Sequence, residues 1–267
     1  MVNTKSQPIG IFDSGLGGLS VTKTIIDLLP KESIIYFGDT AHLPYGDKSA
    51  ATIQGYAAKI VDFLLKQNCK LILIACSSAS AAAYELIKNL VNDQALVVNA
   101  IDPVITHIDN NYRDQVIGLI GTKQTVKSNV YQQKIAALNK NITLNALATP
   151  LLVPIIEEGF MNHSIMENTL KAYLSHPNLQ NIQALILSCT HYPIIKKQVA
   201  KFYCGNIINP NYIISHQVKN ILEQNNLIAN AQDPTHSFYV SDYTEEFAKN
   251  TKLFFQHFVS LAYCKLF

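Results

Sequence analysis

The chain has no tryptophan and a single arginine, Arg113, among its 267 residues. Arginine is the side chain that most often binds a phosphate or carboxylate through paired hydrogen bonds. An anionic ligand must therefore be held mainly by hydroxyl groups, backbone N–H groups or lysines. The chain also has little excess of positive over negative charge, since its net charge is only +2 and 15% of its residues are charged. This balance excludes the basic surface of a protein that binds nucleic acid.

Long apolar runs and paired cysteine motifs are absent as well. No run approaches the roughly 20 residues that span a bilayer, so we expect no membrane segment. Residues 1–8 carry a lysine but no apolar segment after it, unlike a secretory signal, and we expect a cytoplasmic protein. The cysteines are odd in number and lack C-x-x-C spacing, so we expect free thiols at Cys69, Cys76, Cys189, Cys204 and Cys264.

Two similar apolar segments each run into a cysteine. Residues 71–80 read Leu-Ile-Leu-Ile-Ala-Cys-Ser-Ser-Ala-Ser, and residues 184–193 read Ala-Leu-Ile-Leu-Ser-Cys-Thr-His-Tyr-Pro. Such a run is typical of a strand buried on both faces of a parallel sheet. Ligands of open α/β sheets bind at the carboxyl ends of the strands. We therefore predict that Cys76 and Cys189 meet one small molecule from two directions.

Alternating strand and helix patterns predict an α/β protein with parallel sheets. The first strand, 8–12, is followed by a Gly-rich turn at 13–18. Residues 9–14 line up with residues 117–122, as the two cysteine strands line up, which predicts two related α/β units. The other predicted elements are strands over 33–37, 97–103 and 206–211, helices over 19–29, 49–67 and 79–91, and a closing helix within 242–267 that packs on the first unit.

Two thiols on opposite faces of one carbon can remove a proton from one side and return a proton on the other, which inverts the stereocentre. The reaction needs one thiolate and one thiol at the same time, and a free thiol with a pKa of ~8.5 is mostly protonated at neutral pH. Each sulfur therefore needs a neighbour that handles protons. The candidates are Asp13, at the end of the first strand, His191, two residues after Cys189, and, as a weaker third, Glu157.

Each candidate also has an ordinary structural interpretation. Asp13 could serve only as the N-cap of the following helix, and His191 alone could be a capping or surface histidine. Most free cysteines are small buried apolar side chains, and three of the five are interpreted so. Cys76 and Cys189 are favoured as catalytic residues because both end apolar strands and both precede hydroxyl residues.

The turn at 13–18 also permits a dinucleotide-binding interpretation, with Asp39 at the end of the next strand as the ribose ligand. The fit is poor, because Ser20 stands at the third glycine position of G-x-G-x-x-G. In addition, Asp13 at the start of a helix would repel a pyrophosphate. The cysteines and histidines lack the spacing of metal ligands, so no metal site is predicted.

Six motifs follow one another in order over most of the chain, at residues 9–21, 36–46, 75–76, 121–125, 153–159 and 189–193. Among them, the Asp-Ser-Gly-Leu-Gly-Gly loop at 13–18 and Cys-Thr-His-Tyr-Pro at 189–193 form a specific combination. With these motifs the chain resembles the glutamate racemases of the cofactor-independent aspartate/glutamate racemase superfamily. One departure is Ser77-Ser78, where that family usually has Asn-Thr.

The resemblance implies two pseudo-symmetric domains, each a mostly parallel sheet flanked by helices, with the active site in the cleft between them and no cofactor. The expected domains are 1–98 with 211–267, which carries Cys76, and 99–210, which carries Cys189. Cys76 is expected to act on D-glutamate with Asp13, and Cys189 on L-glutamate with His191. The residues expected to contact substrate are Asp13, Ser14, Pro44, Tyr45, Gly46, Ser77, Ser78, Thr122, Thr125, Thr190 and His191.

The implied role is the supply of D-glutamate for peptidoglycan, and hence for cell-wall biogenesis and cell shape. A homodimer is the family expectation. Two alternatives stay open. The pair Ser77 and Ser78 suggests a racemase of another amino acid or related acid. The same altered loop would also suit a glutamate-binding protein on this scaffold in which catalysis has changed.

Overall fold

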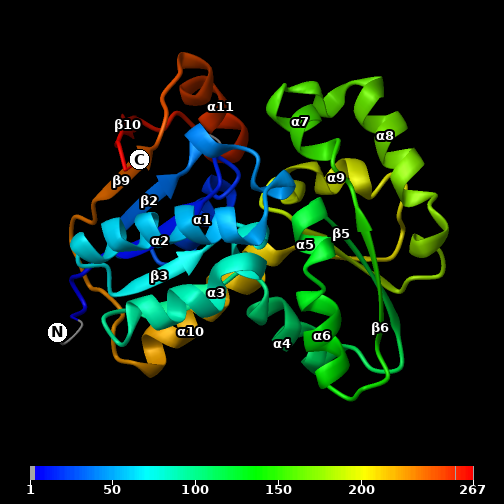
Figure 1. The fold of residues 1–267 in the computed structure, drawn as a ribbon, viewed down its shortest axis with the longest axis horizontal. Helices are drawn as coiled ribbons and strands as arrows, with labels where there is room; N and C mark the ends of the chain where they lie inside the picture. The colour runs from blue at the N-terminus through cyan, green and yellow to red at the C-terminus, as the bar shows by residue number, and fades with distance from the viewer. Residues whose placement is uncertain (1–3, 256, 267) are drawn as a thin grey trace.

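Two parallel β-sheets, each flanked by helices, form the body of the protein (Figure 1). The computed structural model describes residues 4–255 and 257–266. The larger sheet has the strand order β10-β9-β2-β1-β3-β4, the smaller one has the order β6-β5-β7-β8, and all these pairings are parallel. The predicted α/β class is therefore confirmed. The strands are β1 Ile9–Asp13, β2 Ile34–Gly38, β3 Leu71–Ile74, β4 Leu96–Asn99, β5 Val116–Gly121, β6 Thr143–Ala148, β7 Ala184–Ser188, β8 Asn206–Ile208, β9 His236–Val240 and β10 Leu261–Tyr263.

Apolar side chains on both faces of the strands pack against helices, because successive residues of a strand point to opposite faces. In β1, Ile9 and Ile11 pack in one core with α1, α10 and α11, and Phe12 packs in another core with α2 and α3. In β5, Ile117 and Leu119 pack with α4 and α6. The helices are α1 Leu19–Leu28, α2 Ala50–Lys66, α3 Ser77–Val91, α4 Asp102–Asn111, α5 Lys123–Lys127, α6 Val130–Ala137, α7 Leu152–Glu157, α8 Ser164–Leu174, α9 Lys196–Val199, α10 Pro210–Gln224 and α11 Glu245–Phe255.

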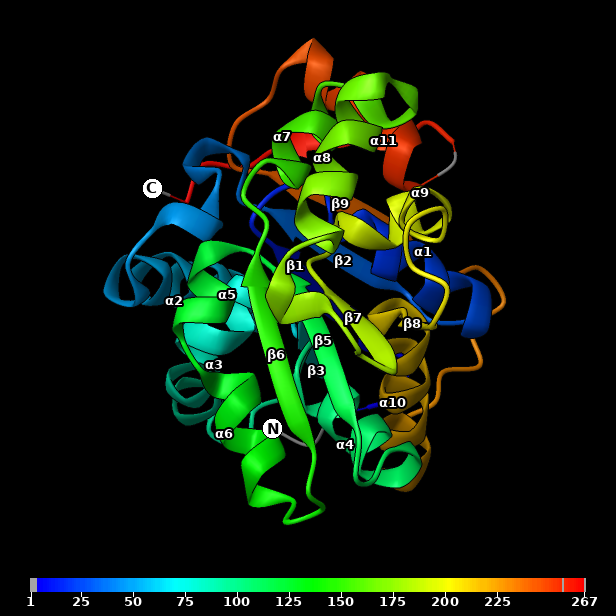
Figure 2. The same ribbon diagram turned by 90° about the vertical axis from the view of Figure 1, so that its right-hand side faces the viewer.

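The two sheets repeat one strand order. The order β2-β1-β3-β4 in the larger sheet corresponds strand by strand to β6-β5-β7-β8 in the smaller one. Figure 2 shows the smaller sheet in front, with β1, β2 and β3 of the larger sheet behind it. Strand β1 thus corresponds to β5, and β3 to β7. The predicted alignment of residues 9–14 with 117–122, and of the two cysteine strands with each other, is confirmed.

The C-terminal segment differs from the predicted closing helix within 242–267. Helix α11 covers only Glu245–Phe255, and strand β10 follows and pairs with β9, which in turn pairs with β2. These strands give little sequence signal, because β9 begins with the polar residues His236 and Ser237 and β10 is an edge strand of only three residues. The expected packing on the first unit is confirmed by the contact of α11 with α1. Residues 256 and 267 of the predicted helix lie outside the described residues.

Other predicted elements differ from the structure. The predicted strands over 97–103 and 206–211 are too long, because β4 ends at Asn99 and β8 at Ile208, and helices α4 and α10 begin at Asp102 and Pro210. Helix α3 begins at Ser77, two residues before its predicted start, so that Cys76 is its N-cap. Strand β6 has no counterpart among the predicted elements, because its residues are only partly buried or exposed and form no continuous apolar run.

The domain boundaries stay a prediction, and helix α10 beside one of them packs against both α1 and α4. Within the described residues, no helix has both the length and the apolar character needed to cross a membrane.

Candidate active site

A cavity of about 240 Å³ lies where the carboxyl ends of the two sheets face each other. Ser14 and Cys76 follow β1 and β3 of the larger sheet, and Thr122 and Cys189 follow β5 and β7 of the smaller one. The residues that follow these strands of both units therefore line the same cavity, as expected at the carboxyl ends of α/β sheets. The predicted site residues that line the cavity are Ser14, Pro44, Tyr45, Gly46, Cys76, Ser77, Ser78, Thr122, Glu157, Cys189, Thr190 and His191.

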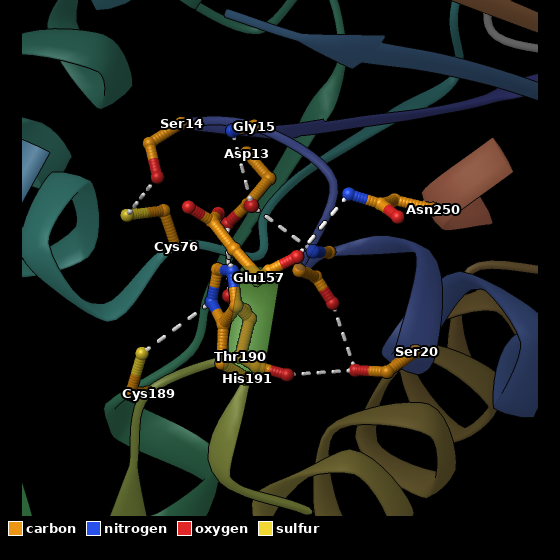
Figure 3. A network of polar contacts seen from close by, with 12 residues as sticks. Asp13, Ser14, Gly15, Ser20, Cys76, Glu157, Cys189, Thr190, His191 and Asn250 are labelled. Atoms are coloured by element: carbon orange, nitrogen blue, oxygen red, sulfur yellow. Dashed lines mark hydrogen bonds and ion pairs between the residues drawn. The ribbon is translucent and has the colours of Figure 1, made fainter. Parts of the chain in front are cut away.

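Cys76 lies at the junction of β3 and α3. Its Sγ accepts the N–H of Ala79 at 3.4 Å. It donates to Oγ of Ser14 at 3.7 Å (Figure 3). Burial, together with the negative charges of Asp13 and Cys189, raises the pKa of the Cys76 thiol to about 12. At neutral pH Cys76 is therefore a thiol, ready to give a proton to the ligand in the cavity.

Cys189 begins a chain of three polar side chains. Its Sγ lies 3.7 Å from Nδ1 of His191, and Nε2 of the same imidazole lies 2.9 Å from Oε1 of Glu157 (Figure 3). Burial lowers the pKa of His191, but the hydrogen bonds to Cys189 and Glu157 outweigh burial and raise this pKa to about 10. His191 is thus protonated at neutral pH, and its positive charge lies beside the Cys189 sulfur.

The structural interpretation of His191 does not fit these contacts. The side chain is 3% exposed, so it is not a surface residue, and it makes no capping hydrogen bond to the short helix that follows it. Its ring also packs edge to face against Phe254 of α11 at 5.2 Å between centroids. The imidazole is therefore fixed on several sides, with both ring nitrogens directed at polar atoms.

Asp13 lies behind the cavity wall and is fully buried. Its Oδ2 accepts the N–H groups of Gly15 at 3.3 Å and Gly18 at 3.0 Å, and its Oδ1 accepts the hydroxyl of Thr190 at 3.3 Å. Burial raises the pKa of this carboxyl, although the charge of His191 and the three hydrogen bonds act in the opposite direction. Gly18, and not Asp13, is the N-cap of α1, and the Asp13 carboxylate accepts the N–H of this N-cap residue.

The loop between β2 and α2 forms one rim of the cavity and is held by Asp39. This residue is fully buried, and its carboxylate accepts the hydroxyls of Tyr45 and Ser241, each at 2.6 Å, and contacts Nδ1 of His42 at 2.8 Å. Tyr45 and Gly46 line the cavity, so Asp39 ties this rim to the segment after β9. A carboxylate with these partners is not free to bind a ribose, and the dinucleotide interpretation does not fit the structure.

Hydroxyl groups form the opposite rim. Oγ of Ser78 lies 2.8 Å from Oγ1 of Thr122, which lies 3.0 Å from Oγ1 of Thr125. Thr125 is 1% exposed and supports Thr122 from behind instead of lining the cavity. A Cβ added at Gly46 would lie 2.9 Å from Cβ of Thr122. The two rims therefore meet at this point, and only glycine fits there.

Other lining residues were not among the predicted site residues: Leu43, Asp47, Lys123, Thr149, Pro150, Val153, Pro154, Glu158 and Tyr192. Most are direct chain neighbours of predicted residues, whereas Thr149 and Pro150 follow strand β6, which has little sequence signal. Nζ of Lys123 lies 3.1 Å from Oδ1 of Asp47, so these two lining residues form an ion pair at the cavity. Among the described residues, no group of three or more His, Cys, Asp or Glu side chains could hold a metal ion.

Comparisons with known proteins agree with this geometry. The model of the Asp/Glu/hydantoin racemase family matches residues 9–213. A glutamate racemase from Neisseria meningitidis is 36% identical over 241 residues, which cover 89% of this chain and 88% of that protein. A glutamate racemase from Francisella tularensis, solved in complex with D-glutamate, is 40% identical with a TM-score of 0.93, and the match covers 98% of both chains. The isoform RacE1 from Bacillus anthracis is 28% identical with a TM-score of 0.92 over the same shares.

Proposed function

Since the chain belongs to the Asp/Glu/hydantoin racemase family, we propose that it interconverts L- and D-glutamate by proton transfer at Cα between Cys76 and Cys189. One observation carries this proposal: two buried cysteines from the corresponding strands β3 and β7 line a single cavity, each with its own polar neighbours. The activity is that of an isomerase. The Francisella relative binds D-glutamate, and the identity of 40% supports the same substrate here.

In the direction from L- to D-glutamate, the Cys189 thiolate takes the Cα proton from one face of the substrate. The Cys76 thiol then gives its proton to the opposite face. The C–H bond that breaks and the C–H bond that forms lie on opposite sides of Cα, so the configuration inverts and no proton is gained or lost overall. The free protein is set for this direction, because His191 is protonated beside Cys189 and the raised pKa of Cys76 keeps its proton in place.

In the direction from D- to L-glutamate the roles reverse, and Cys76 must first lose its proton. Asp13 is the acidic side chain whose charge acts most strongly on Cys76, and we assign it to the Cys76 half-reaction. Burial raises the pKa of Asp13 toward neutral pH. A carboxyl group with a pKa nearer the working pH can both accept and return a proton.

Hydroxyls, backbone N–H groups and one lysine are available to hold the two carboxylates and the ammonium of glutamate. Ser14, Thr122 and Thr190 line the cavity, and the lysine is Lys123, whose ammonium group also contacts Asp47. We also propose that the product serves peptidoglycan synthesis in the cytoplasm and that the protein forms a homodimer. Sedimentation velocity over a range of concentrations tests the dimer.

Isotope exchange tests the proposed reaction directly. Each pure enantiomer of glutamate is incubated with the protein in deuterium oxide without added cofactor, and the Cα proton is followed by NMR while optical rotation is recorded. We expect the enantiomer that forms to carry deuterium at Cα. Saturating glutamate that neither exchanges nor racemises would overturn the proposal. Thermal stabilisation without exchange would then indicate a binding protein, and exchange with another acid from a panel of enantiomers would indicate a different substrate.

A further inference from the structure

A hydroxyl at the start of α1 reaches the turn that joins the Cys189 sulfur to His191. Oγ of Ser20 lies 2.9 Å from the carbonyl oxygen of Thr190, the residue between Cys189 and His191, and 2.8 Å from the carbonyl oxygen of Gly17 (Figure 3). Ser20 is 8% exposed. Helix α1 packs on the larger sheet, and Thr190 follows strand β7 of the smaller one. The hydroxyl of Ser20 therefore links the two halves of the molecule beside the cavity.

Asn211, in the first turn of α10, controls the direction of this hydroxyl. Nδ2 of Asn211 donates to Oγ of Ser20 at 3.1 Å. A serine hydroxyl has one proton to donate and two lone pairs that can accept. Because the amide of Asn211 occupies a lone pair, the proton of Ser20 is left for the two carbonyl groups. Asn211 is 7% exposed, so water competes little for these positions.

The backbone of the Gly-rich loop touches the same turn. A Cβ added at Gly17 would lie 2.5 Å from Oγ1 of Thr190 and 2.5 Å from Nδ1 of His191. On its other side, the Thr190 hydroxyl donates to Asp13. Thr190 is thus held through its carbonyl by Ser20 and through its hydroxyl by Asp13. A rotation of this one residue would change the position of His191 relative to the Cys189 sulfur.

We propose that Ser20, oriented by Asn211, is a positioning residue for the Cys189–His191 pair. Neither side chain lines the cavity, so neither is expected to touch substrate. Loss of the Ser20 hydroxyl removes the hydrogen bond from helix α1 to the carbonyl oxygen of Thr190. The consequence is a slower proton transfer at Cys189, with a smaller effect on the Cys76 step, which Thr190 reaches only through its hydrogen bond to Asp13. The inference rests on the proposed racemisation.

Rates alone cannot locate the slower step, because two enantiomers have an equilibrium constant of one and kcat/KM must be equal in both directions. The α-deuterium isotope effect on kcat/KM can locate it. We expect Ser20→Ala to lower kcat by about tenfold or more, in line with the sensitivity of catalysis to small displacements. The isotope effect should rise with deuterated L-glutamate, because removal of the label by Cys189 becomes slower. It should fall with deuterated D-glutamate, because the Cys76 step is then no longer limiting.

Two further variants keep the test decisive. Asn211→Ala leaves the Ser20 hydroxyl in place but removes its orientation, and it should move both isotope effects in the same directions by less. Thr24→Ala is the matched control, because the Thr24 hydroxyl lies on the same helix and donates to the Ser20 carbonyl within that helix. Unchanged isotope effects in Ser20→Ala and Asn211→Ala would overturn the inference. Absence of α-exchange in the unmodified protein would instead overturn the proposed function itself.

Discussion

Glu157 binds His191 on the side of the imidazole that faces away from Cys189, with 2.9 Å between Oε1 and Nε2. The carboxylate is therefore one reason why the pKa of His191 reaches about 10. A carboxylate in this place keeps the imidazole charged beside the Cys189 sulfur. The neighbouring residue, Glu158, lines the same cavity, and no hydrogen bond or ion pair joins it to His191 among the described contacts.

Glu157→Gln should therefore lower the pKa of His191 and move the basic limb of the pH–activity profile to lower pH. The pH dependence of the free energy of unfolding should move in the same direction, to lower pH. A histidine with a raised pKa stabilises the fold fully below its unfolded pKa of about 6.5, and this contribution is lost as the pH rises toward about 10. The variant should lose that contribution at lower pH. Urea unfolding and kcat measured from pH 6 to 10 test both effects, and Glu158→Gln should resemble the unmodified protein.

Because Asp13 is fully buried, removing its charge should raise the stability of the fold and lower the activity. Burial raises its pKa, so the folded state prefers the neutral acid, and the fold loses stability as the pH rises from the unfolded pKa of about 3.9 to the raised folded pKa. Asp13→Asn has nearly the same shape and no charge. Its amide oxygen can still accept the N–H groups of Gly15 and Gly18, and the Thr190 hydroxyl can turn to accept from its NH2 group. We expect its melting temperature at pH 7 to rise by about 2 °C for each kcal/mol recovered, while racemisation falls. The difference in melting temperature should shrink at lower pH, and a variant less stable than the unmodified protein at pH 7 would contradict this account.

Replacement of either cavity thiol should slow the reaction strongly. Serine is a much weaker acid than cysteine at the same position, and loss of a general acid or base typically costs 10²- to 10⁴-fold. Cys76→Ser and Cys189→Ser should each reduce racemisation by about that range without unfolding, as judged by circular dichroism. Cys204 is exposed and does not line the cavity, so Cys204→Ser is the control. Full activity in either cavity variant would remove that sulfur from the mechanism.

The rim that contains Tyr45 predicts an effect on substrate affinity. The Ser241 hydroxyl donates to Asp39 at 2.6 Å and accepts the N–H of Ala41 at 3.0 Å, so it fastens the rim to the segment after β9. Ser241→Ala leaves the chemistry of both cysteines untouched but loosens this rim. We expect KM for both enantiomers to rise several-fold with a smaller change in kcat. An unchanged KM in steady-state assays would show that Asp39 and Tyr45 hold the rim without this hydroxyl.

The strands and the two cavity thiols can be predicted from the sequence, because both follow from local patterns of residues. Apolar runs place Cys76 and Cys189 at strand ends, and the strand order of the two sheets agrees with the internal alignment. The partner of His191 is harder to identify, because the sequence contains two adjacent glutamates and only the course of helix α7 decides which one faces the imidazole. The role of Ser20 is harder still to predict. In the sequence this residue stands out only as a mismatch to a nucleotide-binding pattern, and its contact with Thr190 joins residues 170 positions apart.

The last prediction concerns a buried ion pair at the opposite end of β3 from Cys76. Nζ of Lys70 lies 2.6 Å from Oε2 of Glu32 and donates to the carbonyl oxygens of Lys5 and Leu227 at 2.7 and 2.8 Å. The other oxygen of Glu32 accepts the N–H of Ala229. These contacts join the N-terminal segment, the start of β2, the start of β3 and the segment that leads to β9. Burial lowers the pKa of Lys70, but the bond to Glu32 opposes that shift.

Lys70→Met should destabilise the fold by about 3–5 kcal/mol, because removing one partner leaves a buried charge on Glu32 without compensation. The double variant Lys70→Met/Glu32→Leu should recover part of that loss, since no charge then remains buried. Its kcat should equal that of the unmodified protein, because neither residue lines the cavity. Urea unfolding of the single and double variants measures the difference. If the single variant proved as stable as the unmodified protein, this ion pair would not hold the segment leading to β9 in place.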